Sequence, residues 1–224
     1  MPRPVVPRAD DSRASRLGAS FARSSTRSRR ARQVFLNVPF DDIAGYEDCF
    51  LAYIAGLVGI GLTPRSVLEI PSGRADRVTR IFRLMRQCRY SIHDLSRTQW
   101  RAGTPRFNMP FEAGLATALS LMGRPAHDRY VFASDHRLVQ RAASDLGGVD
   151  VYAHGGTARG AIAAMTNAFV RRSQSAVVSD LFRLHRRLRD WTDREFRRAR
   201  PRRSLYEPAV FRSLVVFATR LARG

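Results

Sequence analysis

The chain has 224 residues, 44% of them hydrophobic, which suits one α/β domain with a sizeable core and short appendages. It contains no run of about 18 apolar residues, so no membrane span is expected. The two cysteines, Cys49 and Cys88, lie in separate apolar segments without metal-type spacing. They predict buried, reduced thiols in a cytoplasmic protein.

The formal charge of +20 comes from arginine alone, because the chain contains no lysine. The net charge is +7 in residues 1–32, +3 in residues 33–170 and +10 in residues 171–224. A nearly balanced middle segment therefore lies between two basic flanks. Such flanks attract nucleic acid through a salt-dependent, sequence-independent force. The pattern fits weak non-specific nucleic-acid binding or merely solvated, compositionally biased tails, and it leaves a homo-oligomer open.

Strands and helices alternate along the middle of the chain. Residues 1–32, rich in Arg and Ser and without apolar periodicity, predict a disordered basic tail. Apolar runs and helical periodicity then predict elements in this order: strand 34–38, helix 42–60, strand 64–70, helix 74–88, strand 91–95, loop 96–108, helix 109–122, strand 129–134, helix 136–145, strand 149–152 and helix 156–173.

This alternation is typical of a sheet whose strands are mainly parallel and covered on both faces. It predicts a five-stranded, flavodoxin-like, doubly wound domain over residues 33–174. Residues 175–224 predict an Arg-rich C-terminal helical appendage, made of two amphipathic helices that separate near Pro201.

Two carboxylates are the candidate catalytic residues. Glu112 lies at the start of helix 109–122, and Asp94 lies at the end of strand 91–95. In doubly wound sheets ligands bind beyond the carboxyl ends of the strands, where both residues are expected. Carboxylates so placed could hold and cleave a glycosidic bond. The alternatives are that Glu112 only complements the helix dipole and that Asp94 only caps a turn.

Four further side chains are candidates for substrate binding. Asn37, at the end of the first strand, could bind ribose or base, or could close the turn before Pro39. Asn108 could orient a ligand or cap the helix. Phe40 and Phe111 could stack on a base or pack in the core.

Several classes of site are excluded by missing motifs. No GxGxxG follows the first strand, and no Walker sequence occurs. The five histidines show no metal-type spacing, so no metal site is expected. No bound cofactor is expected either, although NAD could be a substrate.

Three of these segments, Val34–Phe40, Cys88–Ser96 and Pro105–Gly114, resemble a group of uncharacterised bacterial proteins. That group is similar to nucleoside 2-deoxyribosyltransferases and to TIR-type domains. The resemblance covers about residues 33–170. It implies that Glu112, in its Phe-Glu-x-Gly context, is a nucleophile, and that Asp94 touches the sugar.

The sequence departs from that pattern in two places. The tyrosine that some transferases carry near the first strand end is replaced by the region of Asn37, and Met-Pro precedes Phe111. The combined expectation is a domain that binds a nucleoside, nucleotide or NAD and cleaves or transfers its N-glycosidic bond. The alternative is a non-catalytic TIR-like nucleotide sensor or interaction module.

Overall fold

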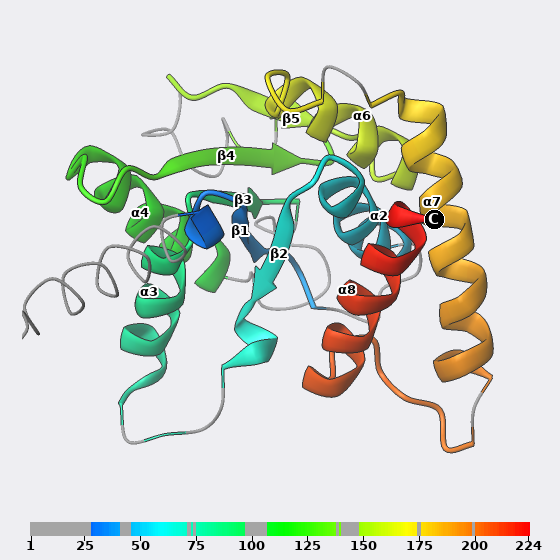
Figure 1. Ribbon diagram of the computed structural model, residues 1–224. Coiled ribbons are helices and arrows are strands. Elements are labelled where there is room, and N and C mark those ends of the chain that lie inside the picture. Colours follow the sequence, from blue (N-terminus) through cyan, green and yellow to red (C-terminus); the bar gives the residue numbers. More distant parts are fainter. Residues whose placement is uncertain are drawn as a thin grey trace, which may run out of the picture.

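The computed structural model describes residues 28–40, 46–70, 73, 75–96, 107–137, 139, 148–173, 176–198 and 200–224. Its centre is a sheet of five strands: β1 (Gln33–Asn37), β2 (Thr63–Ser66), β3 (Tyr90–Asp94), β4 (Asp128–Ala133) and β5 (Val151–Ala153). The strands lie in the order β2-β1-β3-β4-β5, and every neighbouring pair is parallel. This is the predicted doubly wound α/β fold (Figure 1).

Strand β1 lies in the interior of the sheet, and all five of its residues are buried. Val34 and Leu36 face one hydrophobic cluster, whereas Phe35, between them, faces another. Because both faces are covered, a parallel strand reads as a continuous apolar run instead of an alternating one. That explains why this segment was recognisable from the sequence.

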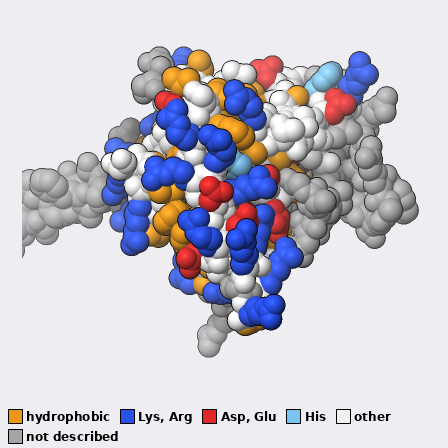
Figure 2. Space-filling view, turned by 90° about the vertical axis from the view of Figure 1, so that its right-hand side faces the viewer, with side chains coloured by type: hydrophobic (Ala, Val, Ile, Leu, Met, Phe, Trp, Pro, Cys, Tyr) orange, Lys and Arg blue, Asp and Glu red, His pale blue; other side chains and the backbone are white. Residues whose placement is uncertain are grey.

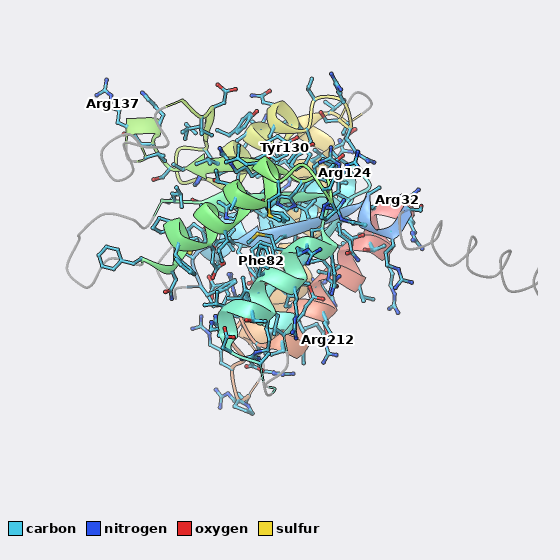
Figure 3. The ribbon with its side chains drawn as sticks, turned by 90° about the vertical axis from the view of Figure 1, so that its left-hand side faces the viewer. Arg32, Phe82, Arg124, Tyr130, Arg137 and Arg212 are labelled. Carbon is cyan, nitrogen blue, oxygen red and sulfur yellow. The ribbon has the colours of Figure 1, made fainter. Side chains whose placement is uncertain are left out.

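Two helices cover the face of the sheet that Phe35 faces. They are α3 (Arg77–Gln87) and α4 (Asn108–Leu121), seen in front of the sheet in Figure 3. Ile81, Leu84 and Met85 of α3 pack with residues of α4 in that cluster. The Asp76 side chain caps α3 by accepting a hydrogen bond from the Thr79 backbone N–H at 2.8 Å.

The opposite face carries α2 (Tyr46–Gly59) and α6 (Ala158–Ala168). After a first turn that carries Glu47 and Asp48, helix α2 is apolar all round, as expected for a helix packed on both sides. Two glycines of α2 allow side chains of the neighbouring helices to pack closely against its backbone. A Cβ at Gly56 would strike Met165 of α6, and one at Gly59 would strike Leu181.

The C-terminal helices form a further layer on α2. They are α7 (Val178–Thr192), continued by a π-helical stretch (Asp193–Arg197), and α8 (Pro208–Arg223). Leu188, Phe211 and Leu214 join the same cluster as α2 and are almost fully buried. The predicted appendage is therefore packed onto the domain, with α2 between it and the sheet (Figure 1).

The described chain begins inside the segment that was predicted to be a disordered tail. Arg30 donates hydrogen bonds from Nε to the Arg86 carbonyl at 3.0 Å and from an Nη to the Ala126 carbonyl at 2.7 Å. Residues 28–32 thus belong to the domain, and the expectation of disorder is wrong for them. These contacts join residues far apart in the chain, which the spacing of apolar residues does not indicate. Residues 1–27 lie outside the described residues.

Other differences concern the ends of elements. The predicted strand 64–70 ends at Ser66, where a 3₁₀ turn (Val67–Glu69) begins with a capping box. Much of the predicted helix 136–145 lies outside the described residues. None of the described helices is long and apolar enough to cross a membrane.

A chain truncated after Ala176 tests whether α7 and α8 are part of the core. Without them the outer face of α2, including Phe50 and Leu57, would be exposed to water. We expect the truncated chain to lose its cooperative thermal unfolding transition, measured by circular dichroism. Removing residues 1–27 is the control and should leave the transition in place. A truncated chain that unfolds as cooperatively as the full chain would contradict this packing.

Candidate functional site

The switch point of the sheet lies between β1 and β3. From these two strands the chain winds outward in opposite directions, to β2 on one side and to β4 and β5 on the other. Ligands of doubly wound sheets bind at the carboxyl ends of such a pair. Here those ends carry Asn37 and Asp94. The predicted loop 96–108, which would follow Asp94 at this edge, falls mostly on residues 97–106, outside the described residues.

Asp94 is fully buried and surrounded by hydrogen-bond donors. The hydroxyls of Tyr46 and Tyr53, both from α2, donate to its Oδ2 at 2.6 and 2.9 Å. His154 Nε2 lies 3.2 Å from the same oxygen. The backbone N–H of Ser96 donates to Oδ1 at 3.0 Å, and the Ser96 hydroxyl donates to it as well. Each oxygen of this carboxylate therefore has at least two donors.

The tautomer of His154 follows from its second nitrogen. Nδ1 lies 3.1 Å from the backbone N–H of Gly156, a group that can only donate. Nδ1 must accept, so in a neutral ring Nε2 carries the proton and donates toward Asp94. Gly155 and Gly156 have φ of 61° and 69°, a left-handed conformation that glycine adopts without strain and that turns the backbone N–H back toward the ring.

This arrangement keeps Asp94 ionised. Burial alone would raise its pKa, but the hydrogen bonds from His154, Ser96 and Tyr46 outweigh burial and lower it to about 2. Burial, and then the charge of Asp94, raise the pKa of Tyr46 and Tyr53 well above the usual value, so both tyrosines stay protonated donors. The predicted sugar contact of Asp94 would require one of these bonds to be broken.

A second polar chain runs along the other face of β3. Asn37 Nδ2 lies 3.0 Å from His93 Nδ1, and His93 Nε2 lies 2.9 Å from Ser91 Oγ. Ser91 Oγ lies 2.9 Å from His127 Nε2, and His127 Nδ1 lies 3.1 Å from the Cys88 carbonyl. An amide nitrogen only donates and a carbonyl only accepts. The direction of every bond is therefore fixed, from Asn37 to Cys88.

The chain works only while both imidazoles are neutral, each donating through one nitrogen and accepting through the other. Burial, then the neighbouring His127, lowers the pKa of His93 to about 3, and burial lowers that of His127. Asn37 also donates to the Met109 carbonyl at 3.0 Å. Both its amide hydrogens are thus used to join β1, β3 and the first turn of α4, which makes Asn37 a positioning residue for that helix.

Glu112 lies three residues after Met109, on the inward face of α4. Its side chain is only 7% exposed, and it has no hydrogen bond or ion pair to any residue that the structure describes. Burial raises its pKa to about 7, against a smaller lowering effect from the Arg77 guanidinium at the start of α3. Near neutral pH this carboxyl can therefore give or take a proton, or act as a carboxylate.

The remaining predicted residues divide between exposed and packed positions. Phe111 is 53% exposed and Asn108 is exposed, one turn apart at the start of α4. The N-cap position of α4 is Phe107, which makes no side-chain cap hydrogen bond, and Asn108 is the first residue of the helix. Phe40 packs edge-on against Phe50 and also against Tyr206, and its ring serves the core beneath α8.

The two candidate carboxylates belong to different faces of the sheet. Asp94 is held from α2, whereas Glu112 projects from α4, which packs on the opposite face. Asn37 and the start of α4 do meet. Sequence reasoning missed Tyr46, Tyr53 and His154, although two hydroxyls seven residues apart in an apolar helix signal a shared buried partner.

Within the described ranges no group of three or more His, Cys, Asp or Glu side chains could hold a metal ion. No protein-family model, no curated protein and no solved structure matches the chain. Its function must therefore be inferred from these side chains themselves.

The change Asp94→Asn should destabilise the fold, because an amide leaves buried donors of Tyr46, Tyr53 or His154 without an acceptor. We expect a loss of roughly 3 kcal/mol in the free energy of unfolding, measured by urea denaturation at pH 7. Asp190→Asn, at an exposed position, is the control and should change stability by about 0.5 kcal/mol or less. The difference should shrink as pH falls from about 4 through about 2, where wild type itself loses the carboxylate. An equally stable Asp94→Asn protein would refute the structural role.

The change Glu112→Gln should have the opposite effect. A pKa raised to about 7 means that ionisation opposes folding: stability is full below about pH 4.5 and falls as pH rises through about 7. The variant should be roughly 3 kcal/mol more stable than wild type at pH 8.5, at about 1.4 kcal/mol per pKa unit, and nearly equal at pH 4.5. Glu195→Gln removes the same charge from an exposed site and should show no such pH dependence. Equal stabilities of wild type and Glu112→Gln at pH 8.5 would disprove the raised pKa.

Proposed function

We propose that this protein binds a nucleotide at the switch point of its sheet and cleaves or transfers an N-glycosidic bond, with Glu112 acting at the anomeric carbon. The observation that carries the proposal is the buried carboxyl of Glu112, which has no hydrogen-bond or ion-pair partner among the described residues and whose pKa is raised to about 7. A structural carboxylate in this fold looks different, as the saturated Asp94 demonstrates.

Chemistry at an anomeric carbon suits such a group. When the C1′–N bond breaks, its electron pair leaves with the base and positive charge develops on the sugar. A carboxylate in a dry site stabilises that charge strongly, or forms a bond to the carbon that water or an acceptor later replaces. Glu112 has no cation within ion-pair distance among the described residues, so its charge is left for the transition state.

The neighbourhood of Glu112 offers groups for the rest of a nucleotide. Phe107 and Phe111 are 69% and 53% exposed, four residues apart at the start of α4, so their rings are free to stack on a base. Asn108, between them, presents an amide to hydrogen-bond a sugar or base. The resemblance to nucleoside 2-deoxyribosyltransferases and TIR-type domains supports the same assignment of Glu112.

Electrostatics favours NAD over a neutral deoxynucleoside. The nicotinamide of NAD carries a positive charge on the nitrogen of the bond to be broken. A cation brought next to a buried carboxyl lowers its pKa and restores the carboxylate that catalysis needs. A neutral nucleoside gives no such help, and would leave Glu112 half protonated at pH 7.

The alternative is a sensor that binds a nucleotide at the same place without turnover. One observation favours it: both oxygens of Asp94 are occupied by protein donors, so Asp94 is not free to assist Glu112. A glycosidase of the usual type employs two carboxyl groups.

Release of free base separates these two functions. Purified protein is incubated with NAD and with a panel of deoxynucleosides, and the products are identified by mass spectrometry. We expect nicotinamide release by wild type, with a kcat/KM that rises with pH through about 7 as Glu112 of the free protein ionises. Glu112→Gln should reduce the rate at least a hundredfold and weaken NAD binding, measured by calorimetry, by roughly tenfold at most, because the carboxylate also faces the nicotinamide cation before the bond breaks.

Glu195→Gln serves as the matched control and should turn over like wild type. Turnover by Glu112→Gln at the wild-type rate would show that the catalytic assignment is wrong. Tight nucleotide binding without release of any base would establish the sensor in its place.

A further inference from the structure

A groove between α7 and α8 lies on the side of the molecule remote from α3 and α4. It has a volume of about 450 Å³ and is lined by Trp191 of α7 and by a stripe of α8: Ala209, Arg212, Ser213, Val216, Phe217 and Arg220. The rings of Trp191 and Phe217 stack in it with centroids 4.1 Å apart and planes at 15°. Val216 beside them is 51% exposed. The floor is therefore aromatic and apolar.

The rim of this groove is positively charged. Arg212 and Arg220 stand eight residues apart on one side of α8, about 12 Å along a helix that rises 1.5 Å per residue. Neither has an ion-pair partner among the described residues, and α8 contains no Asp or Glu. Figure 3 shows Arg212 projecting from α8.

The neighbouring surface of α7 extends the positive charge. A second hollow, of about 490 Å³, is lined by four arginines and two aspartates of α7 and its π-helical extension: Arg183, Arg186, Arg187, Arg189, Asp190 and Asp193. Arg183 and Arg189 form ion pairs with Asp180 and Asp48, whereas Arg187 forms none with the residues that the structure describes. Figure 2 shows arginine side chains crowded over this face, with apolar patches between them.

Charge complementarity identifies the occupant as a polyanion with flat apolar parts. A second copy of this chain would bring like charge. An anionic membrane needs an exposed apolar helix face, but α8 already buries Val210, Phe211 and Leu214 in the core. In a duplex the bases are stacked on one another and cannot stack on the aromatic rings of the groove. Single-stranded nucleic acid offers phosphates to arginines and bases to stacked rings together.

We propose that the α7–α8 groove binds single-stranded nucleic acid without sequence preference, with Trp191 and Phe217 as a stacking platform and Arg212 and Arg220 as phosphate contacts. This site is separate from Glu112 and does not depend on the proposed nucleotide chemistry. It also assigns the nucleic-acid binding expected of the basic residues 171–224 to a defined surface.

The test uses the full chain and a fluorescently labelled 15-nucleotide oligothymidylate, with affinity measured by anisotropy. The double variant Arg212→Gln/Arg220→Gln should bind at least tenfold more weakly, and the slope of log affinity against log salt should fall by about 1.4. The matched control, Arg83→Gln/Arg86→Gln, removes the same charge from exposed positions of α3 and should change affinity less than about threefold.

A second probe isolates stacking. An abasic oligonucleotide of the same length keeps the phosphates but lacks bases, and wild type should bind it about tenfold more weakly than oligothymidylate. Equal losses in the two double variants would overturn the proposal, because binding would then follow net charge alone. Equal affinity for abasic and base-bearing strands, or binding to phosphatidylglycerol vesicles with none to the oligonucleotide, would also overturn it.

Discussion

The carboxylate of Asp94 holds together the carboxyl edge of the sheet. It collects hydrogen bonds from α2 through Tyr46 and Tyr53, and from the end of β5 through His154. The Ser96 hydroxyl, which donates to Asp94, also accepts the backbone N–H of Ser134 after β4 at 2.7 Å. A buried charge persists in a protein only when it is this thoroughly solvated by fixed dipoles. One saturated carboxylate therefore joins the end of β3 to α2, to the end of β5 and, through Ser96, to the end of β4.

Glu112 is the counterpart on the other face of the sheet. Both carboxyl groups are buried, yet the pKa of Asp94 is lowered to about 2 and that of Glu112 is raised to about 7. The difference lies in the hydrogen-bond donors: several surround Asp94, whereas no residue in the described part of the chain donates to Glu112. In many proteins, two carboxyl groups acquire different pKa values from their surroundings and then serve different roles. Hydrogen bonds hold Asp94 in a structural role, whereas Glu112 keeps a carboxyl group that can exchange a proton near pH 7.

The sequence was sufficient for the fold because each buried strand is a short apolar run bounded by turn residues, and each helix repeats its apolar face. It also predicted Glu112 and Asp94 near the carboxyl edge of the sheet, where doubly wound folds in general bind ligands. It could not assign their roles. Two partners of Asp94, Tyr46 and Tyr53, lie 48 and 41 residues before it, in a helix whose tyrosines are typical of a hydrophobic core. The third, His154, follows β5. Spacing patterns describe single elements, whereas saturation of a carboxylate depends on how distant elements meet. Phe40 illustrates the same limit, since its packing against Tyr206 depends on the docking of the C-terminal helices.

The account depends most directly on the ionisation of Glu112, which ¹³C NMR can follow in protein labelled at the glutamate side-chain carboxyl. The chain contains five glutamates, so the spectrum is simple, and Glu112→Gln assigns the resonance by removing it. We predict that this carboxyl titrates at about pH 7 in the free protein and that its pKa falls when NAD binds. A Glu112 resonance that titrates near pH 4.5, with or without NAD, would contradict the central claim.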